Sequence, residues 1–374
     1  MKTRAAVLRA VKTPWRIEDV ELDAPREDEV LVRILAAGLC HSDDHPVQGD
    51  MPANLPLIGG HEGAGVVEAV GANVTRVAPG DHVAFSFLPE CGVCAPCVAG
   101  RRESCVKQIE EGTGLQLQDA TARHHAADNG EDLHLWCSLG TFAERTVVNE
   151  LQVIKIDPEV SFAAAALVSC GVGTGWGAAV RSSQVQRGDT AVVVGLGGLG
   201  MSAVQGFRFA GAANIVGVDP VVGKHALARK LGATHTVATI DEAAAIIAGL
   251  TDGRMAERGV ITIGGPGSGS ILASIMALIG RRGRMVMASI SPVAQIDVKL
   301  SLIDLTMGEK ELVGSIYGHG SAERDVPALL ELYKAGVLDL DSLITAHYSL
   351  DQINEGYAAM HAGSNIRGVI DMQS

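Results

Sequence analysis

The chain has 374 residues, of which 47% are hydrophobic and 20% charged, and its formal net charge is −13. This length exceeds what one hydrophobic core usually serves, so two domains are expected. The negative charge disfavours nucleic acid and anionic membrane surfaces as partners. Charges interrupt the apolar stretches near the N-terminus, and the longest apolar runs, such as 271–279, are shorter than the ~20 residues that cross a bilayer. We therefore expect a soluble, cytoplasmic protein.

Residues 1–100 have the pattern of short strands separated by turns. The strands are rich in β-branched or alternating residues, and Gly, Pro and Asp stand between them. This pattern predicts an irregular, mostly antiparallel β domain. The expected strands are 5–9, 29–37, 63–70 and 81–87.

Four cysteines follow in the spacing Cys91-x2-Cys94-x2-Cys97-x7-Cys105. Thiolates two residues apart on a tight turn can converge on a tetrahedral Zn²⁺ with Zn–S distances of ~2.3 Å, and turn-forming glycine and proline lie between them. A closed four-sulfur shell leaves no position for a substrate, so this zinc is expected to be structural. Four unrelated buried thiols are the alternative, and disulfides are disfavoured in an intracellular chain.

Residues 106–136 break the β pattern, because Gln, Asp, His, Gly and Glu dominate and little periodicity remains. We interpret this segment as an inserted lobe or a long loop. Its His124, His125, Asp128 and His134 superficially suggest a metal site. Because no tight ligand spacing or apolar frame accompanies them, a solvated surface cluster is the expectation.

The pattern changes again from about residue 161. An Ala-rich helix over 162–168 leads into a Gly-rich segment, after which Val- and Ile-rich strands alternate with helical segments up to residue 287. This alternation predicts a parallel, doubly wound sheet. The expected division is a first domain of residues 1–171, a second of residues 172–314, and a final segment of residues 315–374 that returns to the first.

A glycine-rich turn, Gly195-Leu-Gly-Gly-Leu-Gly200, follows the expected strand 191–194 and opens a helix. Such a turn lets the backbone approach a pyrophosphate at a helix N-terminus. Asp219 closes the next strand, where its carboxylate can accept both ribose hydroxyls of NAD and repel the 2′-phosphate of NADP. The sequence therefore predicts NAD(H) binding, with a merely tight strand–helix turn as the alternative. The predicted contacts are Gly195, Gly197, Gly198, Gly200 and Asp219.

Three further residues have the chemistry of an open zinc site. Cys40 lies in the string Gly-Leu-Cys-His-Ser-Asp-Asp-His, His61 lies in Gly-His-Glu-Gly-Ala-Gly, and Cys170 immediately precedes the Gly-rich segment. Taken singly, each favours a structural interpretation, since buried cysteines and satisfied core histidines are common. Taken with the nucleotide motif and the four-cysteine cluster, they form a recognisable set.

Over essentially its whole length, the sequence resembles the zinc-dependent medium-chain alcohol dehydrogenases. The strings around Cys40, His61 and Cys170, the four cysteines and the glycine motif carry this resemblance, and segments 171–177 and 204–214 look most like the nicotinoprotein members. Those members hold NAD(H) permanently and recycle it with an external acceptor such as a nitrosoaniline dye. The resemblance implies an α/β fold with a GroES-like irregular β catalytic domain and a doubly wound parallel-sheet (Rossmann) nucleotide-binding domain. It also implies a homo-oligomer, either a dimer or a tetramer.

The resemblance implies that Cys40, His61 and Cys170 bind a catalytic zinc, so that the first domain holds two zinc ions. Asp43 and Glu62 would then stand behind the ligands, and the Asp43 carboxylate could orient His61 through its other ring nitrogen. Zinc lowers the pKa of a bound alcohol. The nicotinamide then takes the hydride.

By the same resemblance, the Ser42 hydroxyl receives the alcohol proton and passes it through the cofactor ribose to His45 and solvent. His41 stands where many relatives have an arginine on the pyrophosphate, so altered cofactor exchange is expected. An intact Phe87 and many aliphatic residues favour apolar primary or aromatic alcohols and their aldehydes. The resemblance further places His41, Thr174, Lys224 and Arg367 around the cofactor, and Phe87 and Met51 at the substrate pocket.

Two other functions stay open on the sequence. Glutathione-dependent formaldehyde dehydrogenase needs a cationic pocket for an anionic thiol adduct, for which Arg101, Arg102 and Arg123 are candidates. Loss of a zinc ligand or relay residue would favour a non-catalytic, zinc-stabilised nucleotide-binding protein, but all of these residues are present.

Overall fold

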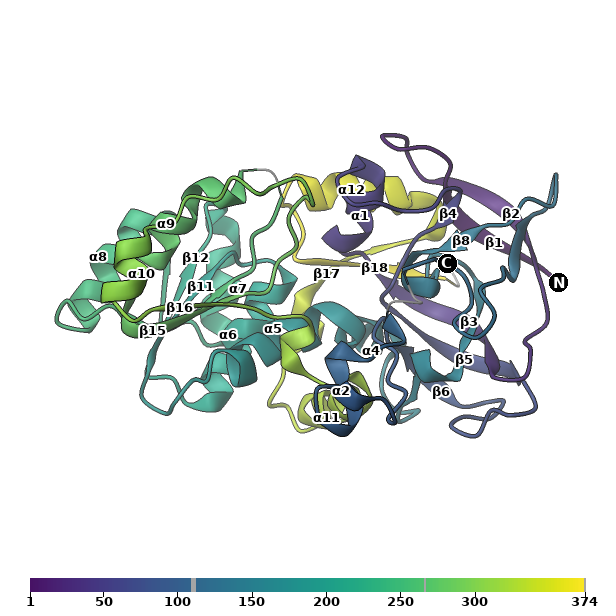
Figure 1. Cartoon of the computed structure of the whole chain (residues 1–374), viewed down its shortest axis with the longest axis horizontal. Coiled ribbons are helices and arrows are strands. Elements are labelled where there is room, and N and C mark those ends of the chain that lie inside the picture. Colours follow the sequence, from purple (N-terminus) through teal and green to yellow (C-terminus); the bar gives the residue numbers. More distant parts are fainter. Residues whose placement is uncertain (109–111, 266, 373–374) are drawn as a thin grey trace. The chain divides into compact units, whose positions relative to one another are not determined.

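The computed structural model describes residues 1–108, 112–265 and 267–372, and Figure 1 draws its helices and strands. The chain divides into unit 1, formed by Met1–Cys170 and Ser321–Ser374, and unit 2, formed by Gly171–Gly320. The second boundary lies later than the expected 314/315, because the residues after 314 still pack within unit 2. A Cβ on Gly177 would lie 2.8 Å from the Cα of Gly318.

Unit 1 contains two sheets in which most neighbouring strands are antiparallel. The first has the order β7-β2-β1-β4-β8, and the second has the order β10-β6-β5-β3-β18-β17, with β9 also paired to β3. The strands of the first sheet are β1 (Lys2–Leu8), β2 (Arg16–Leu22), β4 (Leu57–Ile58), β7 (His124–Ala126) and β8 (His134–Leu135). The strands of the second are β3 (Glu29–Gly38), β5 (Gly63–Val70), β6 (His82–Phe85), β9 (Arg145–Asn149), β10 (Val153–Lys155), β17 (Ile344–Tyr348) and β18 (Arg367–Asp371).

Strand β3 is the centre of the second sheet. Its run of Val, Leu, Ile and Ala is buried along most of its length, as a strand covered on both faces requires. It pairs with β5, β9 and β18, and the register Val369↔Gly38 brings the final segment of the chain beside the end of β3. Cys40 follows this end directly, so well-packed strands fix its position. Among the described residues, the α-helices of unit 1 are α1 (Asp44–Gln48), α2 (Ala95–Val98), α4 (Phe162–Leu167), α11 (Ala322–Lys334) and α12 (Ile353–His361).

The polar segment 106–136 contributes two strands to the first sheet, since β7 pairs with β2 and β8 pairs with β4. Our interpretation as a lobe or long loop missed both strands; residues 109–111 of this segment lie outside the described residues. His124 is fully buried, so its assignment to a solvated cluster is wrong. His125, the next residue, is partly exposed and bonds Asp132 at 2.8 Å.

A buried ion pair ties this segment to β3. The Arg123 guanidinium donates from Nε to Glu29 at 2.9 Å and from Nη2 to the other carboxylate oxygen at 2.6 Å, and both side chains are fully buried. Asp119 also accepts from Arg123 Nη2, at 2.7 Å. Because the charges are paired and hydrogen-bonded, a polar segment can pack inside the unit.

Unit 2 contains a parallel sheet of the order β13-β12-β11-β14-β15-β16, which confirms the predicted doubly wound fold. All five residues of β11 are buried, and Val192 and Val194 share a core with Ala243 and Ile247 of α8. The strands are β11 (Thr190–Val194), β12 (Asn214–Val218), β13 (His235–Val237), β14 (Ala256–Ile261), β15 (Ile279–Met287) and β16 (Glu311–Gly314). The helices are α5 (Gly173–Gly177), α6 (Gly198–Ala210), α7 (His225–Leu231), α8 (Ile240–Leu250), α9 (Leu272–Met276) and α10 (Leu302–Met307).

One helical run, Phe162–Ser182, is long and apolar enough to meet the criteria for a membrane span. The expectation that every apolar run is too short for a bilayer is therefore wrong for this segment. However, 89% of its apolar window is buried inside the protein. That burial is typical of a core helix in a folded protein.

Candidate zinc and nucleotide sites

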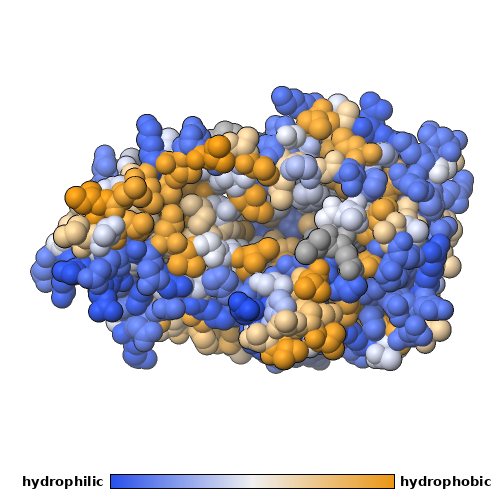
Figure 2. Space-filling model, in the orientation of Figure 1, coloured by the Kyte–Doolittle hydropathy of each residue, from blue (hydrophilic) through white to orange (hydrophobic). Residues whose placement is uncertain are grey.

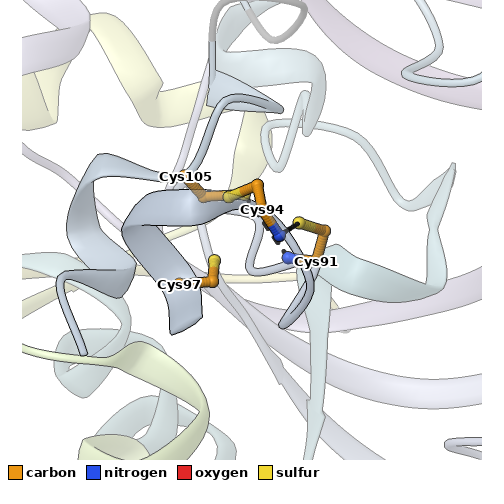
Figure 3. Close-up of side chains that lie close together, drawn as sticks. All are labelled: Cys91, Cys94, Cys97 and Cys105. Carbon is orange, nitrogen blue, oxygen red and sulfur yellow. Dashed lines mark hydrogen bonds between the residues drawn. The ribbon is translucent and has the colours of Figure 1, made fainter. Parts of the chain in front are cut away.

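The four cysteines of the predicted structural site converge in unit 1. Their sulfur atoms all lie within 4.8 Å of one another, and Figure 3 shows the side chains gathering around α2 and its flanking turns. The Cys94 and Cys105 sulfurs are 3.9 Å apart. Gly92 and Gly100 adopt φ values of 75° and 79°, in the region that glycine permits, so the turns between the cysteines form as the sequence indicates.

Backbone N–H groups approach several sulfurs of this cluster and favour the thiolate form of Cys91 and Cys94, whereas burial raises the pKa of Cys97 and Cys105. The N–H of Cys94 points to the Cys91 sulfur and the N–H of Cys91 points to the Cys105 sulfur, both at 3.4 Å. Hydrogen bonds from the N–H groups of Val106 and Cys97 lower the pKa of the Cys94 thiol to about 6. Four thiolates this close repel one another unless a cation lies between them, so the residues fit a zinc ion.

A second cluster forms from Cys40, His61, Glu62 and Cys170, whose ligand atoms also lie within 4.8 Å of one another and are buried. Cys40 follows β3, His61 stands before β5, and Cys170 lies in a π-helical turn, Val168–Val172. A π-turn changes the direction of a helix side chain and is common at functional sites. Residues separated by 130 positions are thus brought to one point, with two sulfurs and an imidazole as soft ligands.

His61 is set up to bind a metal through Nε2. Its Nδ1 lies 2.8 Å from Asp43 Oδ1, which also accepts the N–H of Gly60 at 3.1 Å. Buried Nε2 has no hydrogen-bond partner among the described residues. An unpaired nitrogen in the interior is costly, whereas a metal ion at this position would satisfy it. The donor set therefore fits a zinc ion.

Glu62 and Arg367 form a buried pair behind the ligands. The Arg367 Nη2 donates to Glu62 and, at 3.1 Å, to the carbonyl of Leu39. Burial raises the pKa of Glu62 to about 7, and the Arg367 charge opposes this shift. The ion pair ties the Glu62 carboxylate to Arg367. The supporting role of Glu62 and a contact of Arg367 with the cofactor stay predictions.

The predicted relay and pocket residues lie in unit 1, and two of them contact zinc ligands of the second cluster. Ser42 Oγ is 3.7 Å from the Cys40 sulfur. His45 is buried, and its Nδ1 contacts Asp50 at 2.6 Å. The Phe87 ring stands edge-on to the His61 ring, with centroids 5.7 Å apart. Met51 is half-buried, and its place in the substrate pocket stays a prediction.

Two contacts at this site were missed by sequence reasoning. Asp50 bonds His45, and the Tyr357 hydroxyl donates to the Cys40 carbonyl at 3.4 Å. Asp50 follows His45 closely in sequence, so proximity was the available signal. Tyr357 comes from α12, and no local pattern relates it to Cys40.

The glycine turn in unit 2 has the close contacts that a nucleotide site requires. A Cβ on Gly200 would lie 1.8 Å from the Gly195 carbonyl oxygen, and one on Gly195 would lie 2.6 Å from Thr262 Oγ1. Gly197, the N-cap of α6, has nothing within 4 Å of its Cβ position, so space is open above the helix N-terminus. Gly198 begins α6. This cradle fits a pyrophosphate.

Asp219 lies beside this turn, at the end of β12. Its Oδ2 accepts the Leu196 N–H at 2.8 Å and contacts Lys224 Nζ at 3.2 Å. The structure thus brings Asp219 and Lys224 together, and their cofactor contacts stay predictions. Thr174 is buried in α5. In unit 1, the ring centroids of His41 and His361 are 6.4 Å apart. The cofactor contacts of Thr174 and His41 stay predictions.

A β unit with a closed four-cysteine cluster and an open cluster of two cysteines and a histidine, in one chain with a doubly wound nucleotide-binding unit, defines a zinc-dependent dehydrogenase. Residues 26–158 match the family described as "Alcohol dehydrogenase GroES-like domain", and residues 198–335 match "Zinc-binding dehydrogenase". The chain is 45% identical to the NDMA-dependent alcohol dehydrogenase of Amycolatopsis methanolica over 99% of both chains.

Solved structures agree. An alcohol dehydrogenase zinc-binding domain protein from Burkholderia ambifaria has a TM-score of 0.92 at 33% identity, and the benzyl alcohol dehydrogenase of Acinetobacter calcoaceticus has 0.90 at 28%; each comparison covers 99% of both chains. The chain belongs to the zinc-dependent medium-chain alcohol dehydrogenase family, which confirms the resemblance of its sequence. Zinc and NAD(H) are the cofactors expected of this family.

Proposed function

We propose that this chain interconverts primary or aromatic alcohols and their aldehydes by hydride transfer to NAD. The convergence of Cys40, His61 and Cys170, with His61 Nε2 unpaired among the described residues, carries the proposal. Three protein ligands leave one position of a tetrahedral shell for an alcohol oxygen. The likeness to a benzyl alcohol dehydrogenase supports this substrate class.

The chain's own residues handle the proton and the orientation of the substrate. When bound, zinc supplies Lewis acidity to the alcohol oxygen and NAD supplies the hydride acceptor. The Ser42 hydroxyl, 3.7 Å from the Cys40 sulfur, accepts the alcohol proton at Oγ while its own hydroxyl proton leaves outward, so the serine stays neutral. His45 takes up a proton at Nε2, since its Nδ1 is engaged by Asp50. The Phe87 ring beside His61 gives the pocket an apolar wall.

We further propose that NAD(H) stays bound through turnover and that an external acceptor recycles it. The NDMA-dependent relative supports this proposal, as it shares 45% identity over nearly the full chain. By its resemblance to the family, this chain has His41 where many relatives have an arginine on the cofactor pyrophosphate. A nitrosoaniline is the acceptor class that fits this proposal.

One experiment tests both proposals separately. Purified protein is analysed for zinc and NAD(H) per chain after gel filtration, then assayed with benzyl alcohol using either added NAD or NDMA alone. If NAD(H) stays bound through turnover, the purified protein should contain the nucleotide and oxidise benzyl alcohol with NDMA alone. Nucleotide-free protein that turns over only with added NAD rejects retention and keeps the dehydrogenase proposal. Protein that holds zinc and NAD but oxidises no primary or aromatic alcohol rejects the dehydrogenase proposal.

The alternative of glutathione-dependent formaldehyde oxidation is less well supported. Two of the three candidate arginines for its cationic pocket are already paired, since Arg123 is buried against Glu29 and Arg102 pairs with Glu323 at 3.0 Å, which leaves the exposed Arg101. A non-catalytic role is disfavoured because the convergent ligands keep an open coordination position. Turnover of S-hydroxymethylglutathione in preference to benzyl alcohol would favour the first alternative.

We also propose a cytoplasmic homo-oligomer whose subunits associate through unit 2. Strand β16 is an edge strand, and α10 exposes Leu302, Ile303 and Met307 to 72%, 74% and 72%. Figure 2 shows hydrophobic residues gathered over the part of unit 2 that carries α9 and α10. A second copy would cover this apolar surface. Light scattering should then find an oligomer, and Ile303→Asp should shift the mass toward monomer.

A further inference from the structure

His45 has a carboxylate partner that comes from the turn after its own helix. Asp50 Oδ1 lies 2.6 Å from His45 Nδ1, and the N–H of Asp50 points back to the His45 carbonyl at 3.3 Å. The turn between them depends on Gly49, which ends α1 with φ 73°. The two side chains are 10% and 20% exposed, so bulk water only partly competes for the contact.

This geometry fixes which ring nitrogen carries the proton. A carboxylate accepts hydrogen bonds, so Nδ1 of neutral His45 must be the N–H nitrogen. Nε2 then keeps its lone pair, and it has no hydrogen-bond partner among the described residues. Asp50 also limits rotation of the ring, because Nδ1 must stay on the side of the turn. Both effects prepare Nε2 to accept a proton.

We propose that Asp50 is a positioning residue for proton removal, holding His45 in the Nδ1–H tautomer with Nε2 as the proton acceptor. This inference rests on the proposed function, in which His45 carries the alcohol proton outward. Asp50 touches neither reacting atom and acts only through His45. A loop-closing role is the competing explanation, since Asp50 also joins the end of α1 through its backbone.

The kinetic test is a double-mutant cycle between the two residues. Single-turnover formation of NADH is followed at 340 nm after mixing benzyl alcohol with the NAD-saturated zinc enzyme. Asp50→Ala should slow this step about tenfold, while Asp50→Asn should restore part of the rate because its amide oxygen can accept the same hydrogen bond. In a His45→Gln background, the Asp50 substitutions should have no further effect.

A matched control pair lies on β17 and β18. Asp371 on β18 contacts Nδ1 of His347 at 2.8 Å, which is the same kind of pair outside the site. Asp371→Ala should leave the NADH formation rate unchanged. Zinc content and urea unfolding of each variant separate a kinetic effect from loss of folding.

Nitrogen-15 NMR of histidine-labelled protein reads the tautomer without any turnover. The Nδ1–H signal that disappears in His45→Gln belongs to His45, and in Asp50→Ala it should weaken or move while the protein remains folded. A His45 that carries its proton on Nε2 in the wild type would overturn the inference. So would an Asp50→Ala rate equal to wild type, or an equal slowing in the His45→Gln background.

The same double-mutant cycle distinguishes failure of the proposed His45 relay from failure of the Asp50 inference. If His45→Gln alone leaves the rate unchanged, the relay role in the proposed function fails, and the Asp50 inference fails with it. If His45→Gln is slow and Asp50→Ala is not, only the Asp50 inference fails. If both are slow and their effects do not add, both stand.

Discussion

Asp43 Oδ1 lies 2.8 Å from Nδ1 of His61, and both side chains are buried. The same oxygen accepts the Gly60 N–H, so the carboxylate is fixed in place. This contact directs Nε2 of His61 toward the sulfurs of Cys40 and Cys170. Asp43 lies three residues after Cys40, so this contact links the segment that carries Cys40 to His61.

The Asp43–His61 contact predicts the strength of the second zinc site. Asp43→Ala should lower the zinc affinity of this site about 10- to 100-fold, because the imidazole loses its orientation and part of its basicity. Competition with a chelator measures this affinity. The four-cysteine site in the same chain is the internal control and should release zinc as in the wild type. If the second site releases zinc equally readily in the wild type and in Asp43→Ala, this role of Asp43 is contradicted.

Cofactor choice should depend on Asp219. Asp219→Ala removes the carboxylate that would accept the ribose hydroxyls and repel a 2′-phosphate, so the preference for NADH over NADPH should fall about tenfold or more. Fluorescence titration of cofactor-stripped protein with each nucleotide gives the two dissociation constants. An unchanged ratio in the variant would remove Asp219 from this role. Asp241→Ala, at an exposed position of α8, is a suitable control.

The buried pair of Arg123 and Glu29 predicts a large stability effect far from the cofactor sites. Arg123→Met leaves the Glu29 carboxylate buried without its charged partner, which should cost about 3–5 kcal/mol in free energy of unfolding. Adding Glu29→Gln should recover part of that loss. Arg281→Met removes an exposed pair with Glu309 and should change stability by less than about 1 kcal/mol. Urea unfolding measures the free energy of unfolding of Arg123→Met, of its double variant with Glu29→Gln and of Arg281→Met. If Arg123→Met loses no more stability than Arg281→Met, the buried Arg123–Glu29 pair is dispensable.

The amino-acid sequence predicts local elements of the fold better than it predicts contacts between residues that are far apart in the chain. Most strands and helices between residues 190 and 287 are single apolar or periodic runs, such as 191–194, so local pattern predicts them, whereas α10 and β16 lie beyond the last predicted run. The spacing of the four cysteines predicts the structural site, and resemblance to a known family predicts the other three ligands. In contrast, Arg123 and Glu29 lie 94 positions apart, and Glu62 and Arg367 lie 305 apart. A charged residue has the polarity of a surface position until its partner is known, which is why segment 106–136 was interpreted as a lobe or loop.

His124 gives a pH dependence with a definite sign. Burial lowers its pKa from 6.5 to about 3, because the charged imidazolium loses its hydration inside the protein. Below pH 6.5 the unfolded chain binds a proton that the folded chain refuses, so stability falls as the pH drops toward 3 and is unaffected above 6.5. The expected loss at pH 5 is about 2 kcal/mol.

Comparison of His124→Leu with wild type at pH 7 and pH 5 isolates this effect. The difference in unfolding free energy between the two pH values should shrink by about 2 kcal/mol in the variant. His347→Gln, at an exposed position of β17, is the control and should keep the wild-type difference. A His124→Leu protein with the full wild-type pH dependence would contradict the buried, neutral state of His124.

The central claim is that Cys40, His61 and Cys170 hold a reactive zinc separate from the zinc of the four cysteines. Zinc counting by mass spectrometry in wild type and in Cys170→Ala tests it most directly. The account predicts two zinc ions per chain in the wild type and one in the variant, which should still bind NADH but oxidise no alcohol. One zinc per chain in both proteins, or two in both, would contradict it.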